Sequence, residues 1–469
     1  MRRCALLAAV IGLAGCYSPS IDACALACAA NNACPDGLAC NAQGLCAATA
    51  TDTCVPGDGA VDAPVNPRLM TVEVLDPRGD PQPGVDVVFS DADGATVVQV
   101  MTDAQGLAQT EMEPGGMATV ARVATSPQVA HTAVTYVDLP PGAHIYVQPD
   151  SDVRPPRAVH VAWTPPAQMH EFQVLTSCGS TNTVYPSTET ETTITVPAFC
   201  TEVDVVVTAR SAQTEPPMVA IARAQTSPDV HVGGWEPVDA LAVSVSNLLE
   251  AQAIRPRVTW RMSPSSGGVG GVAQGGYDGA TRTISGLVTR DDVRAAVQLD
   301  IVSTAVGSVG ATQSFAELVP PGAVSHNVDL DGKLVEHVDA PQYLANLRRA
   351  QWTPVKPGLS PGDPDAVQVT LSLMRGPNTS IAWRVIGPTS AIRTDTTAGT
   401  RFVELPPLPS AFPFVPQTGD SLVAGSITLY GVPDIARRAL IARLGVANRS
   451  TPLPALDYLS ASSRSFPTP

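Results

Sequence analysis

Short apolar runs separated by dense proline and glycine turns recur from residue 69 onward, and they constrain the fold more than any other feature. Thr71–Leu75 alternates polar and apolar residues, as a half-buried strand does. Asp76–Pro81 has the composition of a tight turn, and Val85–Phe89 supplies the next apolar run. The 44 prolines and 37 glycines favour many short strands over long helices. We therefore expect an all-β protein of tandem Greek-key, immunoglobulin-like β-sandwiches.

Two nearly identical turn sequences mark the ends of units within this β-rich body. Leu-Pro-Pro-Gly-Ala occurs at 139–143, and Val-Pro-Pro-Gly-Ala occurs at 319–323. Strand spacing in the second unit favours a fibronectin type III or immunoglobulin-like sandwich. Short helices are also expected at Gln342–Arg349 and Asp434–Arg443. The predicted domains of the body are residues 68–149, 150–248, 249–339 and 340–469.

The N-terminus carries an export signal that ends at a cysteine. Arg2 and Arg3 precede a short apolar run, which is followed by Leu-Ala-Gly and then Cys16. The run is too short to span a bilayer as a helix. The order of these residues resembles a bacterial lipoprotein signal with its lipobox. The resemblance implies that residues 1–15 are a signal peptide and that Cys16 becomes a lipid-bearing N-terminus, as with palmitate. The alternative is an ordinary secretory signal with a chance cysteine.

Charge and the residue after Cys16 suggest where such a protein resides. Tyr17 follows the cysteine, whereas an aspartate there would resemble an inner-membrane retention signal. We therefore expect a lipid-anchored protein of the outer membrane, on its surface or its periplasmic face. The formal net charge of −15 disfavours binding to nucleic acid.

Besides Cys16, six cysteines lie close together in residues 16–67, a segment that has few large apolar side chains. They could form a zinc site, but no histidine precedes His131, and exported cysteines pair. We predict three disulfides of undetermined connectivity, which make this a small disulfide-rich segment followed by a linker. A separate Cys178–Cys200 disulfide is predicted to staple the second sandwich. The six clustered cysteines are Cys24, Cys28, Cys34, Cys40, Cys46 and Cys54.

Two further resemblances concern single segments. The stretch from Cys34 to Cys40 resembles the cysteine-rich repeats found near the N-termini of myxobacterial secreted proteins. The turns at Asp76–Val85 and Thr102–Gly106 resemble those of the carboxypeptidase regulatory-like domain, a small sandwich related to transthyretin-like and carbohydrate-binding-like folds. That resemblance implies a non-catalytic module.

The sequence contains no recognisable catalytic or metal motif, so we expect no catalytic residue, metal ligand or cofactor. It has no Gly-x-Ser-x-Gly nucleophile turn and no closely spaced histidine pair. Asp91 and Asp93, like Asp329 and Asp331, precede a glycine and raise the alternative of structural calcium. We interpret all four as turn residues.

Aromatic residues provide the best binding candidates. Trp163, Trp260 and Trp383 alternate with apolar neighbours and are predicted to lie in the core. Trp235 and Tyr277 follow glycine pairs, and we predict that they bind a ligand because loops on a rigid sandwich commonly carry function.

The sequence as a whole predicts a lipid-anchored, non-catalytic envelope protein for adhesion or for binding a glycan or protein. One alternative is a structural component that partners other membrane proteins. An unrecognised hydrolase is the less favoured alternative.

Overall fold

The computed structural model forms two compact units, residues 1–66 and 67–469. In the first unit it describes 39–40, 46–47 and 49. In the second it describes 68–466 apart from internal gaps. These gaps are 77–79, 125–128, 141, 149–155, 168, 170, 187–189, 198–199, 212–217, 248–251, 262–268, 274–275, 279–281, 290–293, 304–311, 321, 356–361, 377–378, 408–418, 433–440, 442–443 and 445–457.

In the first unit, two short strands pair with each other, and each contains one of the clustered cysteines. β1 (Ala39–Cys40) and β2 (Cys46–Ala47) are antiparallel, with Cys40 opposite Cys46. Cys40 is disulfide-bonded, so disulfide chemistry is present in this segment. Cys16 and the predicted signal peptide, together with Cys24, Cys28, Cys34 and Cys54, lie outside the described residues.

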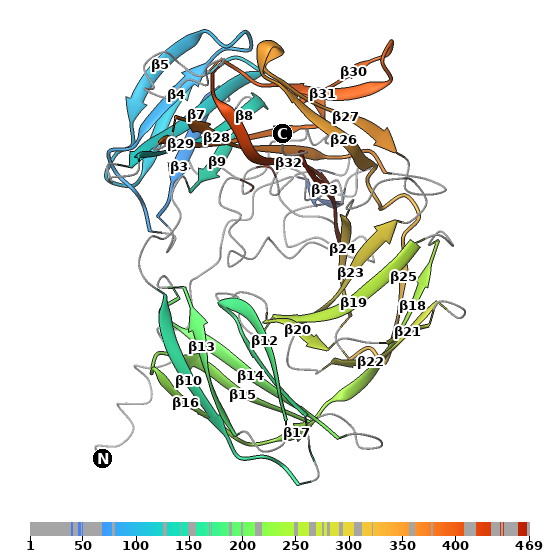
Figure 1. Cartoon of the computed structure of the whole chain (residues 1–469). Helices are drawn as coiled ribbons and strands as arrows, with labels where there is room; N and C mark the ends of the chain where they lie inside the picture. Colours follow the sequence, from blue (N-terminus) through green and yellow to red (C-terminus); the bar gives the residue numbers. More distant parts are fainter. Residues whose placement is uncertain are drawn as a thin grey trace. The chain divides into compact units, whose positions relative to one another are not determined.

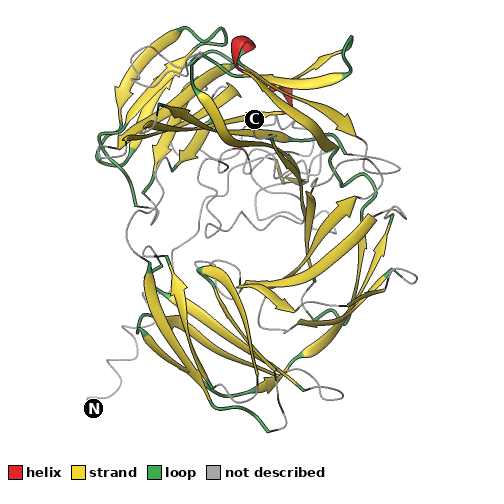
Figure 2. Cartoon of the chain, in the orientation of Figure 1, coloured by secondary structure: helices red, strands yellow, loops and turns green. Residues whose placement is uncertain are grey.

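The described residues contain 33 strands, two short 3-10 helices and the isolated helical residues Ile441 and Leu444, which confirms the all-β prediction (Figures 1 and 2). The first sandwich packs a three-stranded sheet, β6-β3-β9, against four strands in the order β5-β4-β7-β8. Its strands are β3 (Leu69–Val74), β4 (Asp86–Ser90), β5 (Thr96–Met101), β6 (Leu107–Glu111), β7 (Gly116–Ala124), β8 (Val129–Leu139) and β9 (His144–Val147).

The second sandwich repeats this strand order. Its first strand, β10, lies between its fourth strand, β13, and its seventh strand, β16. The facing sheet has the order β12-β11-β14-β15-β17. This strand order differs from that of an immunoglobulin domain, which groups strands A, B, E and D in one sheet. The strands are β10 (Arg157–Trp163), β11 (Glu171–Thr176), β12 (Gly179–Pro186), β13 (Glu191–Val196), β14 (Val203–Arg210), β15 (Met218–Gln225), β16 (Asp229–Val232) and β17 (Glu236–Pro237).

The third sandwich has the same order again, with β22-β18-β25 facing β20-β19-β23-β24 and the short β21 beside β22. In all three sandwiches the first strand pairs in parallel with the seventh. The strands are β18 (Asp239–Ser246), β19 (Gln252–Arg261), β20 (Val269–Ala273), β21 (Gly276–Asp278), β22 (Thr283–Thr289), β23 (Arg294–Ser303), β24 (Thr312–Leu318) and β25 (Ser325–Asp329).

The fourth sandwich differs in order, with sheet β26-β27-β31-β30 facing β33-β32-β28-β29. Its strands are β26 (His337–Leu344), β27 (Arg349–Val355), β28 (Ala366–Arg375), β29 (Thr379–Pro388), β30 (Ile392–Asp395), β31 (Thr400–Glu404), β32 (Ser421–Gly431) and β33 (Tyr458–Ser465). Its 3-10 helices are η1 (Ala345–Leu347) and η2 (Thr389–Ala391).

Three of the sandwiches are fused through their edges into one 12-stranded sheet. β24 of the third pairs antiparallel with β33 of the fourth, and β29 of the fourth pairs parallel with β8 of the first. The second sandwich joins the third by packing instead, because Leu175, Val206 and Val219 share the third sandwich's apolar cluster. The predicted domain boundaries therefore separate stretches of chain that share one sheet, and the boundaries themselves stay predictions.

The predicted helix at Gln342–Arg349 is wrong. Gln342 to Leu344 belong to β26 and pair with β27, and only the next three residues form the turn η1. Strand pairing across this hairpin overrides the weak local helical propensity. Of the second predicted helix, Asp434–Arg443, only Ile441 is described, and it is helical.

The predicted core tryptophans are largely confirmed. Trp163 and Trp383 are each 2% exposed, and the side chain of Trp260 in β19 is not described. Within the described residues, no helix has the length and apolar character needed to cross a membrane.

Candidate functional site

Trp235 lies just before β17, at the edge of the second sandwich's core. Its Nε1 donates a hydrogen bond to the Thr164 carbonyl at 2.6 Å, and its ring packs on Phe172 at 6.1 Å. The indole is half-buried, so one part of the ring stays accessible. This anchoring holds the ring rigidly, while ligand binding by Trp235 stays a prediction. Tyr277 lies in β21, and its side chain is not described.

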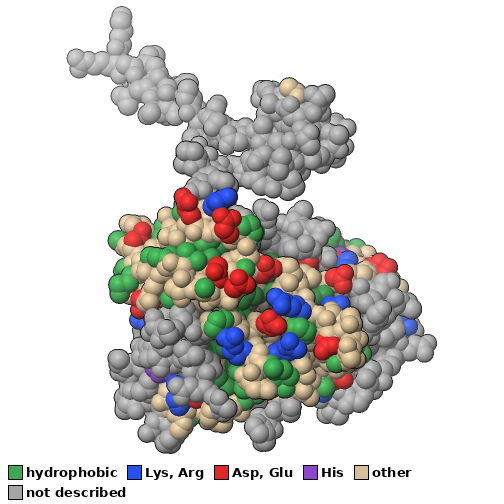
Figure 3. All heavy atoms as spheres, turned by 90° about the horizontal axis from the view of Figure 1, so that it is seen from above, with side chains coloured by type: hydrophobic (Ala, Val, Ile, Leu, Met, Phe, Trp, Pro, Cys, Tyr) green, Lys and Arg blue, Asp and Glu red, His purple; other side chains and the backbone are tan. Residues whose placement is uncertain are grey.

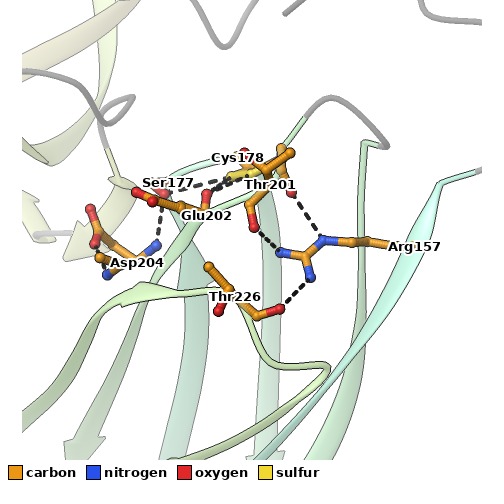
Figure 4. The surroundings of a disulfide bond; sticks show 9 residues. Arg157, Ser177, Cys178, Thr201, Glu202, Asp204 and Thr226 are labelled. Carbon is orange, nitrogen blue, oxygen red and sulfur yellow. Dashed lines mark hydrogen bonds between the residues drawn. A yellow bond between two sulfur atoms is a disulfide. The ribbon is translucent and has the colours of Figure 1, made fainter.

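Cys178 and Cys200 form the predicted disulfide, with their Cα atoms 6.0 Å apart (Figure 4). Arg157 of β10 donates from Nε to the Cys200 carbonyl at 3.0 Å and from a terminal nitrogen to the Thr201 carbonyl at 3.2 Å. On the other side, the Asp204 amide donates to the Ser177 hydroxyl at 2.9 Å. The disulfide thus closes a hydrogen-bonded end of the second sandwich, which is a structural role.

The first aspartate of each pair accepts hydrogen bonds from backbone N–H groups of its own turn. Asp91 Oδ1 accepts the backbone N–H groups of Asp93 and Ala95 at 3.0 and 2.8 Å. Asp329 Oδ1 accepts from the amide of Asp331 and from Asn247 Nδ2, and these bonds lower the pKa of Asp329. The described residues contain no group of three or more acids, histidines or cysteines positioned to hold a metal.

A cleft of about 430 Å³ lies where turns of the first sandwich meet the four-stranded sheet of the fourth. One wall comes from the β4–β5 turn and the end of β8, with Asp93 and Asp138. The other wall comes from η1, β30 and β31, with Leu347, Arg348 and Glu404. Figure 3 shows this side of the molecule, where acidic and basic side chains lie next to one another among hydrophobic ones.

The charges on the two walls differ in how they are paired. Arg393 forms an ion pair with Glu404 at 3.1 Å, and Arg349 approaches the same carboxylate at 3.5 Å. Among the described residues, by contrast, no ion pair or hydrogen bond engages the Arg348 guanidinium or the carboxylates of Asp93 and Asp138. Within the described part of the chain, the cleft therefore presents acids without an ion pair on one wall and an arginine without one on the other.

Two residues that line the cleft also have an unusual backbone conformation. Asp138 and Arg348 have φ angles of 51° and 47°, in the left-handed region that costs energy for residues other than glycine. Such conformations persist where the surrounding structure fixes them, and they cluster at ligand sites. Leu347 beside Arg348 is 53% exposed, which adds an apolar contact to the cleft. The arrangement can bind a ligand that carries charged or polar groups beside an apolar part.

Sequence reasoning missed most of this cleft. Of its residues the sequence points only to Asp93, and there it favours a structural turn. Asp138 and Arg348 carry no motif, and their relation appears only after the first and fourth sandwiches have joined.

Comparisons with known proteins identify no relatives by sequence: no family model matches the chain, and no curated protein does. Among solved structures, a mutant of the shaft pilin SpaA of Lactobacillus rhamnosus GG aligns at 10% identity, covering 35% of this chain and 96% of the pilin, with a TM-score of 0.15. BcpA, the major pilin subunit of Bacillus cereus, aligns at 9% identity, covering 56% of this chain and 97% of BcpA, also with a TM-score of 0.15. The four N-terminal immunoglobulin domains of Dscam1 align at 11% identity over 84% of this chain and 95% of that one, with a TM-score of 0.13. At these TM-scores the similarities carry no argument about function.

Proposed function

We propose that this chain is a lipid-anchored, non-catalytic protein of the outer membrane that binds a glycan or protein ligand for adhesion. The observation that carries the binding role is the cleft between the first and fourth sandwiches, with its unpaired charges of opposite sign on facing walls. Its lining combines carboxylates, arginines and the exposed Leu347, a mixture suited to recognition of a polar ligand.

The construction of the sheet supports this role. The two walls belong to sandwiches whose strands β8 and β29 are paired over eight residues of each strand. The walls belong to different sheets, but the pairing of β8 with β29 joins the two sandwiches that carry them. A cleft between joined sandwiches is held in a fixed geometry, which lowers the entropic cost of binding. The resemblance of the first sandwich to the carboxypeptidase regulatory-like domain also favours a non-catalytic module.

The lipid anchor rests on the N-terminal residues alone. Changing Cys16→Ala is expected to release the protein from membranes, because the acyl chains would be lost. Cys4→Ala is the matched control, since it alters a cysteine within the predicted signal peptide and should leave the protein membrane-bound. If the Cys16→Ala protein still pellets with membranes after a high-salt wash, the anchor is excluded.

The binding role is tested by arrays of glycans and peptides, followed by titration of any ligand that binds. Arg348→Asn and Asp138→Asn remove one charge each while keeping a residue that tolerates a positive φ. Each is expected to weaken binding about tenfold or more, the loss typical of a charge-assisted hydrogen bond. Arg68→Asn, which alters an exposed arginine of the first sandwich, is the control and should bind normally. Unchanged binding by both cleft variants would exclude the cleft as the site.

A further inference from the structure

The strand β5 forms one end of the 12-stranded sheet, and the described strands pair with it on one side only, through β4. Its sequence, Thr-Val-Val-Gln-Val-Met, contains no charge and no proline. Val97 and Met101 are 53% and 63% exposed, which makes them two of the most exposed large apolar side chains. An uncharged, apolar edge with unpaired backbone groups is a template for pairing with another strand.

Most other described strands at the ends of sheets carry a feature that disfavours pairing. Proteins block free edges with charged residues, proline or short strands. β20, at the opposite end of the same sheet, contains Gly270 and Gly271, which weaken a strand. The remaining terminal strands include β6 with Glu111, β13 with Glu191, β25 with Asp329 and β30 with Arg393.

The residues of β5 are self-complementary about Gln99. In an antiparallel pair with a two-fold axis at Gln99, Val97 lies opposite Met101 of the second copy, and Val98 lies opposite Val100. Val97, Gln99 and Met101 share one face because side chains alternate along a strand. Each exposed apolar side chain therefore meets an apolar partner, and the two glutamines meet at the axis.

The other face of β5 is also suited to this pairing. Val98 and Val100 are half-buried and pack against the core of the first sandwich. Across the axis they would extend that apolar layer into the second copy. A two-fold interface requires the same surface on both partners, and β5 supplies it from residues that carry no charge. The neighbouring Asp86 of β4 accepts a hydrogen bond from Gln99 Nε2 at 3.2 Å.

We propose that two copies of this chain associate through antiparallel pairing of their β5 strands about Gln99. The pairing continues the 12-stranded sheet of one copy into that of the other. It uses the same edge-to-edge contact that already joins β24 to β33 within the chain. The inference does not depend on the cleft or on the lipid anchor.

The first experiment measures mass in solution across a range of concentrations by light scattering. The full chain with Cys16→Ala is used, so that shared detergent micelles do not link copies. We expect a concentration-dependent dimer. Val97→Lys should shift the protein to monomer with unchanged circular dichroism, because Val97 is exposed. A protein that is monomeric at every concentration, or a dimer unaffected by Val97→Lys, would overturn the proposal.

Two further variants test the register. The double variant Val97→Lys/Met101→Glu places opposite charges across the axis and should restore the dimer that Val97→Lys alone abolishes. Gln99→Cys should form an intermolecular disulfide on oxidation, because directly opposite Cβ atoms in an antiparallel pair lie about 4.5–5.5 Å apart. Gln105→Cys, in the exposed turn after β5, is the control and should remain uncrosslinked. Crosslinking at position 105 rather than 99, or no rescue by the double variant, would exclude this register.

Discussion

The fourth sandwich is joined to the first and to the third by the same device, edge-to-edge strand pairing, but the two junctions are built from different side chains. At the first–fourth junction, where β8 meets β29, Val88, Met117 and Ala133 share one apolar cluster with Trp352 and Trp383. Trp383 Nε1 also donates to the buried Thr135 hydroxyl at 3.0 Å. Apolar burial therefore dominates this junction.

At the third–fourth junction, where β24 meets β33, polar side chains bind the chain segment that enters β26. The amide of Val335 donates to Ser460 Oγ at 3.2 Å, and Gln313 Nε2 donates to the Val335 carbonyl at 2.6 Å. The amide of Val338 donates to Ser462 Oγ at 3.3 Å. Beside these bonds, His337 is buried, and no described residue forms a hydrogen bond with either of its ring nitrogens.

The difference teaches that one sheet can be extended either by apolar contacts or by specific hydrogen bonds, which do not tolerate loss of a partner. Burying an unpaired polar group costs more than a made hydrogen bond contributes. The apolar junction should thus contribute more stability per side chain, and the polar junction should respond more to single-atom changes.

Trp383→Ala is expected to produce the largest effect. It removes a fully enclosed ring from the first–fourth junction, and a loss of about 3–5 kcal/mol in the free energy of unfolding is typical of such a change. Trp383→Phe keeps most of the ring but loses the bond to Thr135, so its loss should be clearly smaller. Denaturant unfolding followed by tryptophan fluorescence and circular dichroism measures both. Equal losses would show that the hydrogen bond, and not apolar burial, holds this junction.

Gly94→Ala tests the contact between the β4–β5 turn and the fourth sandwich. Gly94 has a φ of 86°, and an added Cβ would lie 2.8 Å from Pro407 side-chain atoms. Gly84 has a φ of 73° but nothing within 4 Å, so Gly84→Ala isolates the backbone cost of about 1–2 kcal/mol. Gly94→Ala should cost more than Gly84→Ala in thermal unfolding. Equal losses would mean that the turn and Pro407 separate without cost.

How far the sequence predicted these regions depends on the range of the interactions. The alternation in Thr71–Leu75 predicted β3, and the turn residues after it predicted where β4 begins. The junctions could not be predicted, because Thr135 and Trp383 are 248 positions apart and an edge strand has no sequence motif that names its partner. The cleft could not be predicted for the same reason, since Asp138 and Arg348 line one cleft only after the first and fourth sandwiches have joined.

Ser462→Ala probes the polar junction with the loss of one oxygen. It leaves the buried Val338 amide without an acceptor, which is expected to cost about 1–2 kcal/mol. Ser463→Ala is the matched control, because Ser463 is half-buried and bonded to Thr428 on the opposite face of β33, where water can replace it. Comparable losses in urea unfolding for the two variants would contradict the special role of the inward-facing serines.

The smallest expected effect is a pH dependence at the same junction. Burial lowers the pKa of His337, and the attraction of Asp339 opposes this only in part. The unfolded chain, with a histidine pKa of about 6.5, therefore binds a proton that the folded chain resists. Stability should fall as the pH drops below that value, down to the lowered pKa of the folded state.

His337→Gln removes this titration, so the difference in unfolding free energy between pH 7 and pH 5 should shrink. His131, whose pKa burial also lowers, is present in both proteins and cancels in the comparison. If the two proteins lose the same stability between these pH values, the buried imidazole at the third–fourth junction does not set its acid sensitivity.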